Sequence, residues 1–117
     1  MIKTIIIDDE KHCIITLEHL LKQNKNVMVV ATTQDSTKAK ALIEEHKPDL
    51  VFLDIEMPKM NGFDVITQFN PVPFKVIFTT AYDQYAIKAI KFAAFDYLLK
   101  PIDIEELKSA IVRIEVA

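Results

Sequence analysis

Short runs of β-branched and other apolar residues alternate five times with segments whose apolar residues recur at helical spacing. The strand-like runs cover residues 5–7, 27–31, 50–53, 76–78 and 97–99. The helical patterns cover residues 12–22, 36–46, 63–69, 84–92 and 104–114. Strands that are apolar along their whole length must be covered on both faces, so this order predicts a parallel sheet between layers of helices. We therefore predict an α/β, doubly wound fold of five βα units.

The composition limits the classes of protein to which the chain can belong. Half of the 117 residues are apolar, which suffices for the core of one domain. The net charge is −3 without a basic cluster, so we expect this segment itself to bind no nucleic acid. The single cysteine, Cys13, excludes an internal disulfide and favours a cytoplasmic location. We expect no membrane span, because no apolar run reaches about 18 residues.

The only glycine in the chain is Gly62. Phosphate-binding loops of the P-loop and dinucleotide-binding types need several glycines at fixed offsets, because the backbone must approach the phosphate closely. Both of these large nucleotide-binding classes are therefore excluded.

Polar side chains follow four of the five predicted strands. Asp8, Asp9 and Glu10 follow the first strand, Asp54 the third, Thr79 and Thr80 the fourth, and Lys100 the fifth. In an open parallel sheet, the binding crevice lies outside the carboxyl ends of the strands. If the first and third strands are neighbours, three aspartates share one corner with a hydroxyl and an ammonium group.

Clustered carboxylates are unfavourable without a counter-charge, because each raises the pKa of the others. Mg²⁺ resolves this conflict, since it binds one or two carboxylates together with water and phosphate oxygens. The same corner suits a phosphoryl group, with one aspartate as the nucleophile that forms a mixed anhydride. The alternative is that these acidic residues only cap the following helix, as an isolated Asp pair usually does.

Four motifs carry a resemblance to a known family. They are Ile5-Ile6-Ile7-Asp8-Asp9-Glu10, Leu53-Asp54-Ile55-Glu56-Met57-Pro58 with Asn61-Gly62, Phe78-Thr79-Thr80-Ala81, and Asp96-Tyr97-Leu98-Leu99-Lys100-Pro101. With these motifs the chain closely resembles the receiver domains of two-component response regulators, over essentially all of residues 1–117. The resemblance implies a flavodoxin-like receiver fold with strand order 2-1-3-4-5. It also implies a phosphoacceptor domain that catalyses only its own phosphorylation and dephosphorylation, and is otherwise not an enzyme.

The resemblance also implies the site residues. Asp54 is then the phosphoacceptor, and Mg²⁺ or Mn²⁺ binds Asp9 directly, Asp8 mainly through water, Asp54, and the backbone carbonyl of Glu56. Thr80 matches the switch hydroxyl, and Thr79 lies one residue too early. Lys100 matches the lysine that pairs with a phosphoryl oxygen, with a cis bond to Pro101. Tyr97 matches the aromatic switch residue.

Similarity to this family further implies partners. A histidine kinase would donate the phosphoryl group. The segments 81–86 and 96–101 look most like receivers of LytTR-type transcription regulators, so we expect residues 1–117 to be a receiver excised from a longer DNA-binding protein, with a free-standing receiver as the alternative. In this family, the positions of Glu56 and Tyr82 tune how long the phosphoryl group survives. Because Tyr82 is bulky and can screen the phosphoryl group from water, we expect slow self-dephosphorylation.

The fourth predicted helix is apolar over more than one face. Most of its apolar residues are expected in the core, but the excess favours homodimerisation through the fourth helix, fifth strand and last helix on phosphorylation. Three alternatives remain: a haloacid-dehalogenase-like phosphatase, a flavin carrier, and a receiver that is never phosphorylated. His12, Cys13 and His19 show no sound metal-binding spacing, and we expect surface or packing roles for them.

Overall fold

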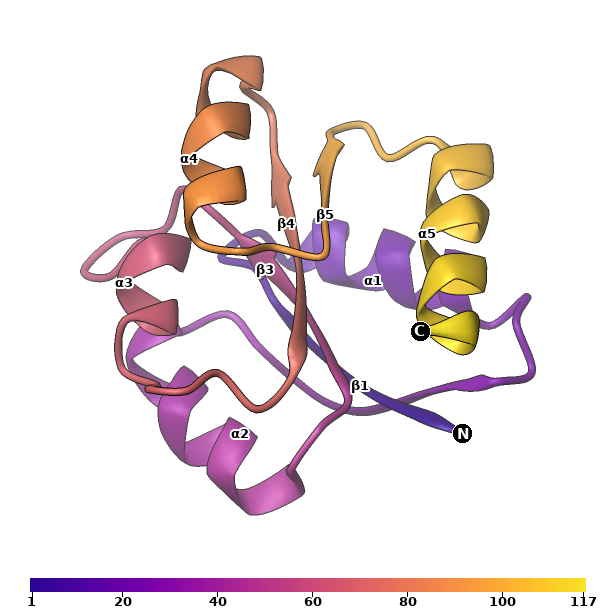
Figure 1. Ribbon diagram of the computed structural model, residues 1–117, viewed down its shortest axis with the longest axis horizontal. Helices are drawn as coiled ribbons and strands as arrows, with labels where there is room; N and C mark the ends of the chain where they lie inside the picture. The colour runs from indigo at the N-terminus through magenta and orange to yellow at the C-terminus, as the bar shows by residue number, and fades with distance from the viewer.

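The computed structural model describes residues 1–117, and a five-stranded parallel sheet with strand order β2-β1-β3-β4-β5 runs through its centre (Figure 1). The strands are β1 (Ile2–Ile7), β2 (Val27–Thr33), β3 (Leu50–Asp54), β4 (Lys75–Thr80) and β5 (Asp96–Leu99). The helices are α1 (Lys11–Leu21), α2 (Ala39–His46), α3 (Gly62–Ile66), α4 (Ala86–Lys91) and α5 (Ile104–Val116). All strand pairs are parallel. The predicted doubly wound fold and strand order are therefore confirmed.

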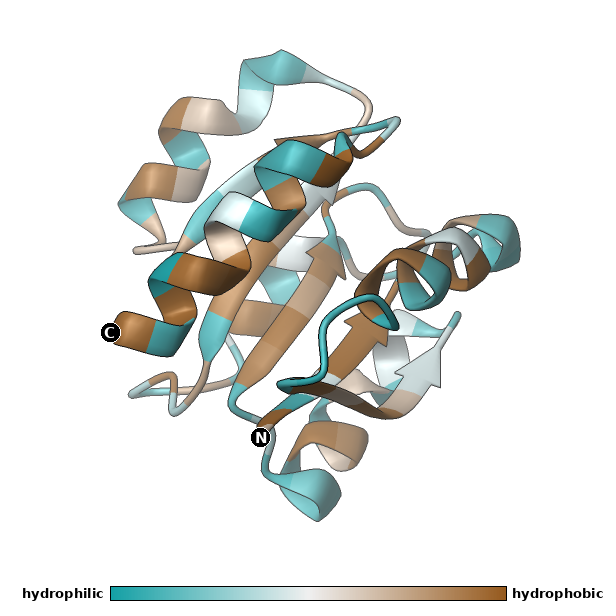
Figure 2. Ribbon diagram, turned by 90° about the vertical axis from the view of Figure 1, so that its right-hand side faces the viewer, coloured by the Kyte–Doolittle hydropathy of each residue, from teal (hydrophilic) through white to brown (hydrophobic).

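Each face of the sheet is buried under its own set of helices. On one face, Ile5, Leu53 and Phe78 pack in a core cluster with residues of α2, α3 and α4. On the other face, Ile6 and Phe52 pack with residues of α1 and α5. Figure 2 shows that the central strands are hydrophobic along their length, whereas the helices alternate hydrophobic and hydrophilic residues. This two-sided burial is the physical reason for the continuous apolar runs in the strand sequences.

Two of the predicted helices begin later than their apolar patterns, and α3 ends at Ile66, before its predicted end at residue 69. Residues 36–38 and 83–85 form 3₁₀ turns, so α2 and α4 begin at Ala39 and Ala86. The first of these turns begins where the Asp35 side chain accepts a hydrogen bond from the backbone N–H of Thr37 at 2.9 Å. α4 ends before Ala93, whose positive φ of 55° is incompatible with a continued right-handed helix. Apolar periodicity alone therefore overestimated the length of these three helices.

Gly62 lies where the loop after β3 turns back against the end of that strand. A Cβ atom at this position would lie 2.6 Å from the backbone oxygen of Asp54 and 3.1 Å from the Cα of Ile55. The Gly62 N–H donates a hydrogen bond to the carbonyl of Ile55 at 2.8 Å. The single glycine of the chain thus permits the close contact that positions the loop behind Asp54.

No helix is long and apolar enough to cross a membrane.

Candidate phosphoryl-acceptor and metal site

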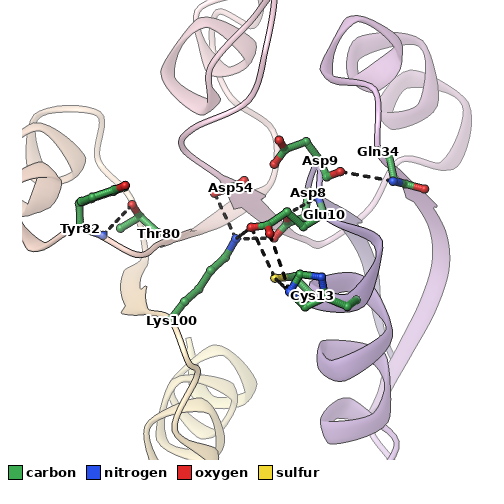
Figure 3. Close-up of polar contacts among 10 residues, drawn as sticks. Asp8, Asp9, Glu10, Cys13, Gln34, Asp54, Thr80, Tyr82 and Lys100 are labelled. Atoms are coloured by element: carbon green, nitrogen blue, oxygen red, sulfur yellow. Dashed lines mark hydrogen bonds and ion pairs between the residues drawn. The ribbon is translucent and has the colours of Figure 1, made fainter.

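Asp8 and Asp54 lie side by side at the carboxyl edge of the sheet. Asp8 directly follows β1, Asp54 is the last residue of β3, and the preceding residues Ile7 and Leu53 are register partners. Only 4% of Asp8 and 3% of Asp54 is exposed, whereas Asp9 is half-buried. The structure therefore brings together the three aspartates that the sequence places at the ends of two strands (Figure 3).

Lys100 reaches this acidic corner from the loop after β5. Its Nζ lies 2.8 Å from Oδ2 of Asp8, 3.4 Å from Oδ1 of Asp54 and 3.9 Å from Oε1 of Glu10. Its backbone N–H donates a hydrogen bond to the carbonyl of Thr80 at 2.7 Å, and its bond to Pro101 is cis, as expected. One ammonium group is therefore shared among several carboxylates.

The corner carries an excess of negative charge. Burial and the neighbouring charge of Asp8 raise the pKa of Asp54 to about 8, although the Lys100 ammonium opposes this shift. Burial by itself lowers the pKa of Lys100, but its hydrogen bond to Asp8 and the charge of Asp54 outweigh burial and raise that pKa. Lys100 thus remains charged. Its single positive charge does not neutralise all of the carboxylates that surround it.

A hard divalent cation fits this donor set. Carboxylate oxygens of Asp8, Asp9 and Glu10 lie within 4.8 Å of one another. Oxygen ligands and an uncompensated negative charge are what Mg²⁺ requires of a protein. Glu56 lies two residues beyond Asp54 in the loop after β3.

Thr80 ends β4 at the same edge of the sheet and is fully buried. Its Oγ1 accepts a hydrogen bond from the backbone N–H of Tyr82 at 3.1 Å. The Tyr97 hydroxyl donates a hydrogen bond to the backbone carbonyl of Tyr82. Thr80 and Tyr97, which the sequence places on different strands, are therefore linked through the backbone of Tyr82.

A contact that we did not predict joins two loops beside the corner. The hydroxyl of Tyr85 donates a hydrogen bond to Oε2 of Glu56 at 3.3 Å, across a sequence separation of 29 residues. The Tyr85 ring also packs against Phe63, with ring centroids 6.1 Å apart. No local pattern pairs residues so far apart, so the sequence carried no signal for this contact.

A doubly wound sheet with an acidic corner and an adjacent lysine defines a receiver-like α/β protein. The family model for the response regulator receiver domain matches residues 4–112. The chain is 39% identical over 115 residues to an uncharacterized response regulatory protein of Yersinia pestis, and 36% identical over 116 residues to the transcriptional regulatory protein BtsR of Escherichia coli. The chain belongs to the response regulator receiver domain family, which sets aside the phosphatase and flavin-carrier alternatives.

Solved structures agree with this assignment. A DNA-binding response regulator of the LuxR family from Staphylococcus aureus superposes with a TM-score of 0.87 at 32% identity, covering 97% of this chain and 98% of that one. The receiver domain of the response regulator AraT from Geobacillus stearothermophilus gives a TM-score of 0.86 at 32% identity, covering 97% and 92%. The alignments with the Yersinia and Escherichia proteins cover 97% of this chain and 48% of each relative. The chain thus spans about half the length of the curated relatives it matches.

Proposed function

We propose that this receiver domain is a phosphorylation-dependent switch in which Asp54 accepts a phosphoryl group from a histidine kinase. The observation that carries the proposal is the position of Lys100, whose Nζ lies within 3.4 Å of the buried Asp54 carboxylate and 2.8 Å of Asp8. A buried carboxylate beside a fixed ammonium group and further metal-binding oxygens combines a nucleophile with the positive charge that phosphoryl oxygens need.

The metal ion of this proposal is Mg²⁺ or Mn²⁺. Asp9, Asp54 and the backbone carbonyl of Glu56 would hold it directly, and Asp8 mainly through water. When bound, the ion neutralises phosphoryl oxygens and the excess charge of the corner. This role agrees with the raised pKa of Asp54, because burial and the charge of Asp8 together outweigh the Lys100 ammonium.

In the proposed transfer, a carboxylate oxygen of Asp54 attacks phosphorus and forms the mixed anhydride. The bond from phosphorus to the donor nitrogen breaks, and its electron pair stays on the donor imidazole. The Lys100 ammonium then pairs with a phosphoryl oxygen, and the Thr80 hydroxyl donates a hydrogen bond to another. The chain does not turn over a separate substrate, so it acts as a phosphoacceptor.

We propose that the backbone of Tyr82 couples phosphorylation of Asp54 to the rest of the domain. Oγ1 of Thr80 accepts a hydrogen bond from the backbone N–H of Tyr82. If the Thr80 side chain turns toward a phosphoryl group, this hydrogen bond breaks. Tyr97 binds the carbonyl of Tyr82, so the same shift changes the position of Tyr97. Tyr82 directly precedes the 3₁₀ turn that leads into α4. A movement of Tyr82 should therefore alter the surface formed by α4, β5 and α5.

That surface is the proposed homodimer interface of the phosphorylated domain. Ile87 and Ile90 of α4 are 71% and 76% exposed, and Leu99 of β5 is 41% exposed. Ala89 is the only buried residue of α4, so the expectation that most apolar residues of this helix lie in the core was wrong, and the two isoleucines face outward. Large apolar side chains gathered on an exposed face are typical of a protein interface.

We further propose that residues 1–117 are the cytoplasmic receiver of a longer, LytTR-type transcription regulator. The support is that the chain matches about half of each relative, one of which is named a transcriptional regulatory protein. DNA binding then belongs to the other half, because this segment carries a net charge of −3.

The proposed function is tested by intact mass spectrometry after incubation with Mg²⁺ and acetyl phosphate. We expect a gain of one phosphoryl group that is absent with EDTA and absent in Asp54→Asn. Asp83→Asn, which changes an exposed aspartate of the 3₁₀ turn before α4, is the matched control and should gain the group normally. A folded, Mg²⁺-bound wild type that gains nothing would instead support a receiver that works through protein contacts alone.

A further inference from the structure

We propose that Glu10, His12 and Cys13 form a second cation site, at the edge of the acidic corner, for a divalent transition metal of the Zn²⁺ type. The Cys13 Sγ lies 3.6 Å from Nε2 of His12 and 4.0 Å from Oε1 of Glu10. Nε2 of His12 lies 3.8 Å from Oε2 of Glu10. The Cys13 sulfur, the His12 nitrogen and the two carboxylate oxygens of Glu10 thus lie close together. One ligand atom from each of the three residues lies within 4.8 Å of the other two, and these three atoms form a triangle.

The size of this triangle suits a tetrahedral ion. Bonds of about 2.3 Å to sulfur and about 2.0–2.2 Å to nitrogen and oxygen place neighbouring ligand atoms about 3.3–3.7 Å apart around Zn²⁺. The separations of 3.6, 3.8 and 4.0 Å involve both carboxylate oxygens of Glu10, so rotations of the exposed His12 and Glu10 side chains bring one oxygen within this range of both other donors. Three protein ligands leave the fourth position for water.

The backbone already holds the three residues together. Glu10 is the N-terminal cap residue of α1, and His12 and Cys13 lie in the first turn of that helix. All three line one cavity of about 380 Å³ between α1 and the segment Lys100–Ile102, which leaves room for an ion and its water. His12 and Glu10 are largely exposed, so the site is open to exchange with solvent.

The two cation sites differ in chemistry. The acidic corner offers only oxygen atoms, which suit Mg²⁺, whereas imidazole nitrogen and thiolate sulfur select Zn²⁺ and related ions. On binding, the Cys13 thiol gives up its proton to solvent and its sulfur electron pair forms the bond to the metal. The spacing of His12, Cys13 and His19 did not predict this site, because the third ligand is Glu10 and not His19.

A titration with Co²⁺ in the presence of saturating Mg²⁺ and a phosphine reductant tests the site. Co²⁺ takes tetrahedral nitrogen and sulfur sites as Zn²⁺ does, and a bound thiolate produces a charge-transfer band in the near ultraviolet. We expect this band to saturate at one Co²⁺ per chain and to disappear when Zn²⁺ is added. Loss of a ligand should weaken binding at least about tenfold in His12→Ala, and Cys13→Ser should abolish the band.

The matched control is His19→Ala, which removes a histidine of the same helix that is not part of the triangle. This variant should bind Co²⁺ as the wild type does, and circular dichroism would verify that every variant is folded. The proposal is overturned if Co²⁺ produces no thiolate band. It is equally overturned if Mg²⁺ displaces the Co²⁺, or if His12→Ala binds as tightly as the wild type, because the ion then lies in the acidic corner.

Discussion

The Lys100 ammonium lies 2.8 Å from Asp8 and 3.4 Å from Asp54, so one lysine is the nearest counter-charge of two buried aspartates. Lys100→Ala should therefore leave both carboxylates without their nearest counter-charge. In EDTA at pH 8 we expect the free energy of unfolding to fall by about 3 kcal/mol, measured by urea denaturation. Mg²⁺ should restore part of this loss, because it supplies positive charge to the same oxygens. Lys91→Ala, which removes an exposed lysine of α4, is the control and should have little effect.

Asp54 should make the stability of the metal-free protein depend on pH. Its pKa is raised to about 8 in the folded state, against about 3.9 in an unfolded chain. Between these values the folded state holds a proton that the unfolded state has lost, so this contribution to stability decreases as pH rises through the interval. In EDTA, the stability of Asp54→Asn relative to the wild type should increase from pH 5 to pH 8, by about 4 kcal/mol at most. An equal difference at both pH values would contradict the raised pKa.

Gly62→Ala should destabilise the fold even though alanine favours helices more than glycine does. The added Cβ would lie 2.6 Å from the Asp54 backbone oxygen, and this backbone cannot move without disturbing the end of β3. We expect a loss of about 2 kcal/mol in urea denaturation. Gln68→Ala, an exposed change just after α3, is the control. A Gly62→Ala protein as stable as wild type would show that the loop relaxes freely.

Tyr82→Ala should shorten the lifetime of the phosphorylated domain several-fold. Its side chain is bulky and half-exposed, and its backbone N–H donates a hydrogen bond to Oγ1 of Thr80, so we expect the ring to hinder the approach of water. The half-life of phosphorylated Asp54 is followed by intact mass spectrometry after the phosphodonor is removed. Tyr82→Phe keeps the ring and should keep the wild-type lifetime. A wild-type half-life of only seconds without a phosphatase would refute screening by Tyr82.

Ile87→Glu combined with Ile90→Glu should keep the phosphorylated domain monomeric. Both side chains are more than two-thirds exposed, at 71% and 76%, so the change should not damage the core. Light scattering of phosphorylated samples at increasing concentration measures the effect. Ile15→Glu alters an equally apolar side chain on α1, which is 55% exposed and lies outside the proposed interface, and should leave dimerisation intact. A phosphorylated wild type that stays monomeric at high concentration would argue against the interface.

The apolar runs in the sequence predicted the sheet, and the polar residues that follow them predicted its acidic corner. The apolar runs at 5–7 and 50–53 can be buried only as central strands, and parallel strands end at one edge. Asp8 and Asp54 meet there because β1 and β3 are neighbours, a strand order that the resemblance to receiver domains implied. Family motifs added Lys100 to that corner, and its contacts with both aspartates agree with that expectation.

The burial of side chains in α4 and the contacts between loops depend on tertiary packing, and the sequence did not predict them. An apolar pattern that covers more than one helix face does not say which face meets the sheet, so the outward positions of Ile87 and Ile90 were not predictable. The contact of Tyr85 with Glu56 depends on how two loops pack after the sheet has formed. The triangle of Glu10, His12 and Cys13 likewise depends on rotamers at the start of α1, which residue spacing does not specify.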